Sequence, residues 1–215
     1  MEELQKRSLQ EALDLIDAED QWEVARSIDH FNEADHNEIA LALIEGGLGE
    51  WIAENLVKFF GADQNEIAQR IISDDGGASI VIDNLESFTG LDHTKTLLLC
   101  IDAGEGEEVP SCLSRFSEAD PNEIALALIE AGRGQAVGEN IGSFLGVDTK
   151  TLLVIIDAGW GRAVMSNLDS FVGLDTEEIE LALIEAERRE FRALRKGEFE
   201  PGTRSHTTHF GTSYR

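Results

Sequence analysis

Residues 116–144 read FSEADPNEIALALIEAGRGQAVGENIGSF, and this stretch decides the fold because its pattern returns along the chain. It begins and ends on a phenylalanine, and an aspartate follows the first phenylalanine by four residues. After the aspartate come an apolar segment, a glycine-containing break and a second, shorter apolar stripe. We interpret this unit as a first helix, a tight loop and a second helix.

The phenylalanine recurs at spacings of 28, 29, 28, 28 and 27 residues. Each time, an aspartate follows it by four residues, and an apolar pair precedes it by seven and three residues. Six matching units cannot arise by chance, so the chain is a repeat protein. The recurring residues are Phe31, Phe59, Phe88, Phe116, Phe144 and Phe171, with Asp35, Asp63, Asp92, Asp120, Asp148 and Asp175.

Local signals mark where the two helices of a unit begin and end. The aspartate suits an N-cap, because its short side chain can accept hydrogen bonds from the free N–H groups of the first turn. A glutamate three residues later predicts a capping box. Glycines should close the first helix, since glycine adopts the left-handed backbone conformation without strain. The capping-box pairs are Asp35/Glu38, Asp63/Glu66, Asp120/Glu123 and Asp175/Glu178.

Helices of about ten residues are unstable alone in water, so stacked neighbours must supply their burial. We therefore predict an all-α fold, an alpha-solenoid of about six two-helix repeats of ~28 residues with terminal capping helices. The repeat domain should span residues 1–196, with repeat boundaries near 35, 63, 92, 120, 148 and 175. A helix from residue 2 to roughly 17 and one long helix over 176–196 should cap it, and 197–215 should form a polar, basic tail.

One unit resembles a known repeat family. Residues 59–88, FFGADQNEIAQRIISDDGGASIVIDNLESF, are similar to the repeats of TALE-like DNA-binding proteins. The similarity rests on Gly76 and Gly77 and on a few apolar positions. This resemblance implies a superhelical stack of short helix hairpins.

The charge is unevenly distributed. The net charge is −26, and residues 27–187 hold 32 Asp and Glu against 7 Lys and Arg. Residues 188–215 reverse the balance, with seven Arg and Lys against three Glu. The acidic body should repel nucleic acid and anionic membranes and attract basic partners. A charged surface that only keeps the protein in solution is the alternative interpretation.

An acidic residue stands in the last turn of each predicted first helix. An acid there opposes the helix dipole, at a cost of roughly 0.3–1 kcal/mol when exposed. In one interpretation, the carboxylate caps the second helix. In the other, the acids form a strip along the loops that binds a basic peptide or protein. These candidate partner-binding residues are Glu45, Asp74, Asp102, Glu130, Asp157 and Glu185.

Asparagine recurs inside the second helix, where it is a poor helix former. Beside an apolar stripe, its side chain is expected to hydrogen-bond the backbone of the next repeat. A ladder of asparagines that reads a ligand is the alternative. The column comprises Asn55, Asn84, Asn140 and Asn167, with Ser27 and Cys112 at the aligned positions.

The remaining chemistry-bearing residues form no recognisable site. Cys100 and Cys112 lie in apolar segments and are expected to be small buried residues. No nucleophile–base pair or acidic dyad stands out, so we expect no enzyme, no cofactor and no metal site. No apolar run approaches the ~18–20 residues of a membrane span, and no signal-peptide segment precedes the repeats. A cytoplasmic location is therefore expected.

The first expectation for function is a non-enzymatic scaffold whose acidic surface recruits a basic protein or peptide. The second is an acidic mimic of nucleic acid that inhibits a nucleic-acid-binding protein. The third is a TALE-like binder of nucleic acid through the basic C-terminal segment, which the acidic body disfavours. The tail, residues 197–215, is either a flexible end or a basic-aromatic peptide that docks on an acidic face and supports self-association.

Overall fold

The computed structural model of the protein describes residues 6–74 and 76–196. Within these ranges every regular element is helical and no strand forms, so the all-α prediction is confirmed. An isolated backbone bridge joins Arg7 and Phe31. Among the described helices, none combines the length and the apolar composition needed to cross a bilayer.

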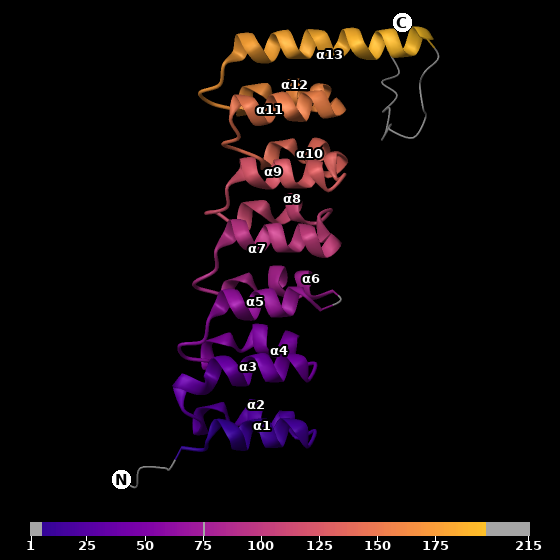
Figure 1. Ribbon diagram of the computed structural model, residues 1–215. Coiled ribbons are helices and arrows are strands. Elements are labelled where there is room, and N and C mark those ends of the chain that lie inside the picture. The colour runs from indigo at the N-terminus through magenta and orange to yellow at the C-terminus, as the bar shows by residue number, and fades with distance from the viewer. Residues whose placement is uncertain (1–5, 75, 197–215) are drawn as a thin grey trace, which may run out of the picture.

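One set of helices forms a continuous stack. Each of these helices contacts the next one of the set, in chain order. Figure 1 shows them as successive layers of a column, from the N-terminus at the bottom to α13 at the top. They are α1 (Leu9–Asp17), α3 (His36–Glu45), α5 (Gln64–Ile72), α7 (His93–Cys100), α9 (Pro121–Glu130), α11 (Thr149–Ile155) and α13 (Thr176–Lys196).

A second set of shorter helices alternates with the first along the chain. These are α2 (Gln21–Arg26), α4 (Gly49–Glu54), α6 (Gly77–Asp83), α8 (Val109–Cys112), α10 (Gly134–Glu139) and α12 (Gly161–Asn167). Each continues into a short 3₁₀ turn that ends just before a recurring phenylalanine. These turns are η1 (Ile28–His30), η3 (Leu56–Lys58), η4 (Leu85–Ser87), η6 (Leu113–Arg115), η7 (Ile141–Ser143) and η9 (Leu168–Ser170).

The recurring apolar residues build the core between the layers. All six recurring phenylalanines are buried, and none has more than 9% of its surface exposed. The apolar pair before each phenylalanine is buried too, from Val24 and Ile28 in the first layer to Val137 and Ile141 near the end. Only the last pair differs, because Val164 is buried while Leu168 is half-exposed.

The recurring aspartates cap the first helices, as predicted, in all layers but one. Asp63 accepts hydrogen bonds from the N–H groups of Asn65 and Glu66. The N–H of Thr151 donates to Asp148 in the same way and holds the pKa of that carboxyl below its usual range. Asp92, Asp120 and Asp175 make equivalent bonds. Asp35 makes none, because it lies inside the turn η2 (Glu33–Asp35) with helical backbone angles.

The predicted capping boxes do not form. At Asp63, Asp120 and Asp175, a side chain of the previous layer accepts from the N–H group of the cap instead. At Asp35, the N–H donates to the carbonyl of Asn32. The side-chain oxygen of an Asn or Thr near the start of one first helix accepts from the backbone N–H of the next cap aspartate. Asn37 accepts from Asp63 at 2.9 Å, and its side-chain N–H donates to Glu66 at 2.8 Å. We call this column the interlayer clamp. The remaining clamps are Asn65–Asp92, Thr94–Asp120, Asn122–Asp148 and Thr149–Asp175.

Glycines close the first helices as the sequence predicts. Five of them adopt positive φ angles of 72° to 100°, which L side chains adopt only with strain. In two layers the first helix passes into a wide turn that contains the glycine, η5 (Ile101–Glu105) with Gly104 and η8 (Ile156–Trp160) with Gly159, and the chain kinks there. The five are Gly47, Gly76, Gly104, Gly132 and Gly159.

The ends of the described chain follow the predictions in part. Helix α13 spans Thr176–Lys196, as predicted. The first helix begins later than predicted, at Leu9, because the side chain of Ser8 accepts from the N–H of Glu11 and caps it there. Residues 2–5 of the predicted first helix, and the predicted tail over 197–215, lie outside the described residues.

Removing one interlayer clamp should destabilise the fold. Asn65 accepts from the N–H of Asp92 and donates to the carbonyl of Gly90, so Asn65→Ala removes two bonds between layers. We expect a loss of about 1–2 kcal/mol in the free energy of unfolding, measured by urea denaturation. The control, Gln135→Ala, removes one bond within a single helix and should cost under about 0.5 kcal/mol. Equal losses would contradict the interlayer role.

His36 should make the stability depend on pH. The ring is 1% exposed, packs edge-on against Phe59, and has no hydrogen-bond partner for either nitrogen among the described residues. Burial chiefly, and then Lys6, lower the pKa of His36 below its ordinary value of 6.5, against the opposing effect of Glu33 and Asp29.

Because the unfolded chain binds the proton more tightly, stability should fall as the pH drops below about 6.5 and should not change with this group above it. His36→Phe should remove that part of the pH dependence, measured by denaturation between pH 5 and pH 8. Substitution of the exposed His30 by Asn should leave the profile unchanged. A His36→Phe profile identical to that of the unaltered chain would show that His36 does not cause the effect.

Candidate binding surfaces

Five of the predicted acidic residues occupy one structural position. Each stands two residues before the left-handed glycine that closes a first helix. The loop that joins the first helix of a layer to its second helix lies on the same side of the column in each layer, on the right in Figure 1. All five side chains are exposed. We call this row the acidic edge: Glu45, Asp74, Asp102, Glu130 and Asp157.

The acidic edge does not cap the second helices. Among the described residues, the N-cap side chains of α4, α6, α8, α10 and α12 make no capping bond, and no acid of the edge accepts a hydrogen bond from a first turn of these helices. The capping interpretation is therefore wrong for these helices. Instead, the left-handed glycine reverses the chain, and backbone hydrogen bonds hold the loop between the two helices. The N–H of Leu48 donates to the carbonyl of Leu43 at 3.0 Å, and the N–H of Arg133 donates to that of Leu128 at 2.7 Å.

Arginines neutralise part of the acidic edge. Arg70 lies 3.6 Å from Glu45 of the preceding layer and 3.2 Å from Asp74. Arg189 on α13 pairs with Asp157 of the layer before it. These exposed ion pairs contribute little to stability. Asp102 and Glu130 have no ion pair within the described residues. Arg133 lies beside them, where it donates to the carbonyl of Gly104 and pairs with Glu107.

Glu185 departs from the predicted column. It is exposed, but it lies inside α13, which continues for eleven further residues to Lys196 with no closing glycine. The sequence pattern grouped it with the others because the apolar positions before it match those of α9. Glu185 therefore shares the helix face of Glu130 but not its place beside a loop.

The asparagine column serves a role other than the predicted one. Each side-chain amide donates to the carbonyl four residues back in its own helix, not to the backbone of the next repeat. The contacts are Asn55 to Trp51, Asn84 to Ile80, Asn140 to Ala136 and Asn167 to Ala163, all between 2.9 and 3.0 Å. The amides therefore satisfy carbonyls where the α-helix tightens into the 3₁₀ turn. Ser27 and Cys112 make similar bonds to Glu23 and Val109.

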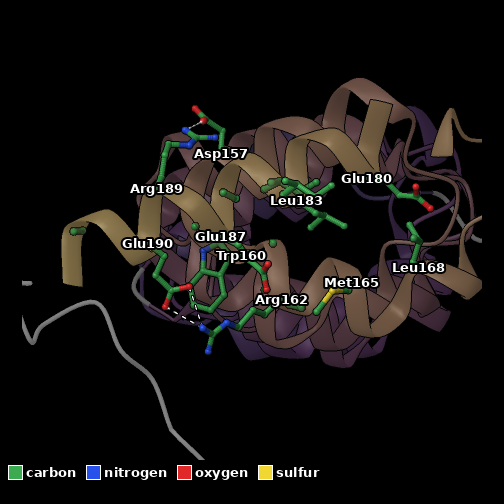
Figure 2. Close-up of a pocket in the computed structure, with 18 of the residues that line it drawn as sticks. Asp157, Trp160, Arg162, Met165, Leu168, Glu180, Leu183, Glu187, Arg189 and Glu190 are labelled. Atoms are coloured by element: carbon green, nitrogen blue, oxygen red, sulfur yellow. Dashed lines mark hydrogen bonds and ion pairs between the residues drawn. The ribbon is translucent and has the colours of Figure 1, made fainter. Parts of the chain in front are cut away.

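The structure adds a surface that the sequence analysis did not predict, an open groove between α12 and α13. Its volume is about 1000 Å³. Apolar side chains from both helices line it, with acidic ones among them. Figure 2 shows Trp160 and Arg162 at one end and Leu168 and Glu180 at the other. We call it the terminal groove.

Trp160 is seated by two glycines of the preceding layer. A Cβ atom at Gly138 would lie 2.1 Å from the indole ring, and one at Gly134 would lie 3.0 Å from the indole nitrogen. The two glycines are one helical turn apart on α10, so they form a flat seat for the ring. The same indole forms part of the groove wall.

Charged residues bridge one end of the terminal groove. Arg162 on α12 donates to both carboxylate oxygens of Glu190 on α13, at 3.1 and 3.2 Å. This pair joins the two helices across the groove (Figure 2). Glu139, Glu180 and Glu187 also line it, and none has an ion pair in the part of the chain that the structure describes. The groove therefore combines an apolar wall with uncompensated negative charge.

The two cysteines are free and buried, as expected. Burial raises the pKa of Cys100 to about 12 and that of Cys112 to about 11, so neither is a reactive thiolate at neutral pH. Over residues 6–74 and 76–196, no group of three or more histidine, cysteine, aspartate or glutamate side chains could hold a metal ion.

Comparison with protein families, with curated proteins and with solved structures finds no match to this chain.

Filling the seat of Trp160 should disturb the groove. Gly138→Ala places a Cβ inside the indole ring, so Trp160 must move, at an expected cost of about 1–3 kcal/mol. Urea unfolding should report the loss, and a change in tryptophan emission should report the movement. The control is Gly142→Ala, whose Cβ meets nothing closer than Asn167 at 3.5 Å. Unchanged emission in Gly138→Ala, with equal stability in both variants, would contradict the packing.

Proposed function

We propose that this protein is a non-enzymatic scaffold, an alpha-solenoid of about six two-helix repeats that binds a basic protein or peptide along its acidic edge. The observation that carries the proposal is the repetition of an exposed acid at one loop position in five successive layers. An acid at a helix C-terminus is mildly unfavourable, and here it caps nothing. Five repetitions of this choice therefore favour a role outside the fold.

Stacking makes the edge suited to an extended partner. Helices that pack side by side lie about 8–10 Å apart, so acids at one position in successive layers recur at about that interval. Lysine or arginine two or three residues apart in an extended peptide, at about 3.3 Å per residue, would match it. Asp102 and Glu130 stand in neighbouring layers without internal partners, and we place the centre of the site there.

The strength of such a site depends on salt. Contacts between exposed charges contribute about 0.2–1 kcal/mol each and weaken as the ionic strength rises. Several layers acting together supply useful affinity, and the net charge of −26 adds long-range attraction that speeds encounter with a basic partner.

A mimic of nucleic acid is the second candidate, and the regular recurrence of carboxylates along one edge favours it. Its partner would be a nucleic-acid-binding protein, and nucleic acid would compete for the same surface. The interval of about 8–10 Å between layers exceeds the phosphate rise of 3.4 Å along one DNA strand, so the general basic partner stays first.

Neutralising the centre of the edge tests the proposal. The full chain and the variant Asp102→Asn/Glu130→Gln capture proteins from a lysate of the source cells at low and moderate salt. Quantitative mass spectrometry should show that basic proteins held by the unaltered chain bind about 2- to 30-fold more weakly to the variant. The melting temperature of the variant should be no lower than that of the unaltered chain, because the two acids make no described ion pair and oppose the helix dipole.

The control variant Asp83→Asn/Glu86→Gln changes the net charge equally at exposed positions on α6 and η4, away from the edge. It should capture what the unaltered chain captures. An equal loss of captured proteins in both variants would show that net charge alone causes the binding, and it would contradict the proposed site on the acidic edge. Displacement of the captured proteins by DNA would move the mimic ahead of the general scaffold.

A further inference from the structure

The terminal groove lies where the stack lacks a second helix. In lower layers the second helices pack on one another, as α4 does on α6 and α10 on α12. Helix α13 forms the first helix of the last layer, contacting α11 and α12. No second helix follows it within the described residues, so α12 and the flank of α13 are left uncovered beside each other (Figure 1).

Side chains in the groove are exposed where their counterparts below are buried. Leu168 is half-exposed, whereas the equivalent Ile141 of the preceding layer is 2% exposed. Met165 is 53% exposed, whereas the equivalent Ala53 of an earlier layer is fully buried. Ile184 on α13 adds a further apolar side chain that is 47% exposed. These residues form an apolar surface that a segment of chain would cover.

The chain itself continues beyond α13 for nineteen residues, 197–215. Gly197 and the Pro201-Gly202 pair are residue types that favour a chain reversal. The last thirteen residues, TRSHTTHFGTSYR, contain two arginines, two histidines and two aromatic residues, and no acid. This composition complements a groove that has an apolar wall and three glutamates without ion pairs.

The segment has the length to reach and fill the groove. The groove runs along α13 from Glu180 to Ala193, which is about 20 Å at 1.5 Å per residue. Ala193 is one helical turn before the end of α13. Residues 203–215 span up to about 43 Å when extended, at ~3.3 Å per residue. After a reversal at 197–202, they can follow α13 back along the whole groove.

We propose that residues 203–215 dock in the terminal groove of their own chain and complete the last layer. Phe210 and Tyr214 cover the apolar wall, and Arg204 and Arg215 face the free glutamates. The pairing is electrostatic and apolar and requires no helix in the segment. This inference does not depend on the proposed binding of a basic partner at the acidic edge, whose centre at Asp102 and Glu130 lies outside the groove. Asp157 belongs to both surfaces, and Arg189 pairs with it.

Photo-crosslinking in the full chain tests the docking. Phe210 is replaced by p-benzoylphenylalanine, and the dilute protein is irradiated as an equal mixture of ¹⁴N- and ¹⁵N-labelled chains. Mass spectrometry identifies the linked peptides. We expect links from position 210 to Met165 or to residues 180–193, joining peptides of the same isotope label. Links of mixed label would show docking on a second copy, and links elsewhere or none would also overturn the proposal.

Charge reversal supplies the matched comparison. In this chain, Glu180→Lys/Glu187→Lys places two cations in the groove and should lower the cross-link yield by about 3- to 30-fold. Glu50→Lys/Glu54→Lys makes the same charge change on the exposed face of α4 and should leave the yield unchanged. Circular dichroism of each variant verifies that the helices are intact. Equal yields from both variants would overturn the electrostatic part of the proposal.

Discussion

Each layer of this protein buries its apolar side chains only against its own second helix and the layers before and after it. The helices have mostly ten residues or fewer, too short to persist alone, so burial between layers supplies the free energy that holds them. The recurring phenylalanine and the apolar pair before it form that interface, with Leu168 of the last pair as the one half-exposed member. The interlayer clamp adds a directional contact, because an Asn or Thr of one layer fixes the backbone where the next first helix begins.

This dependence also explains how the surfaces arise. A residue type that recurs at one position of the unit forms a row along the stack. The acidic edge arises in this way, because an acid occupies the same loop position in five layers. Among the described residues, the interior layers have a neighbouring layer on both sides, but the last layer has one on one side only. The terminal groove is the consequence, since within the described residues α13 is the one helix after α12 that packs on it. The acidic edge and the terminal groove therefore both follow from the stacking of layers.

The sequence predicted the features that each unit repeats within itself. The phenylalanines, the cap aspartates and the closing glycines depend on local chemistry, and the structure places them as expected, except that Asp35 makes no capping bond. The contacts between units were not predicted from the sequence. Asn65 and Thr94 look like ordinary polar residues of a first turn, although their recurrence after the cap aspartate was a visible signal. The capping box and the asparagine bonds were assigned to the wrong partners, because a pattern shows which group needs a partner but not which neighbour supplies it. The groove could not be predicted at all, since it depends on how the chain ends its stack, where no second helix follows α13 within the described residues.

Native-state hydrogen exchange measures the dependence between layers most directly. If each layer is held by its neighbours, amides of α5, α7 and α9 should exchange most slowly. Protection should then fall stepwise toward α1 at one end and α13 at the other, because the end layers have a neighbour on one side only. Uniform protection along the chain, or end helices as well protected as α7, would contradict the account, because the helices would then owe their stability to something other than the stack.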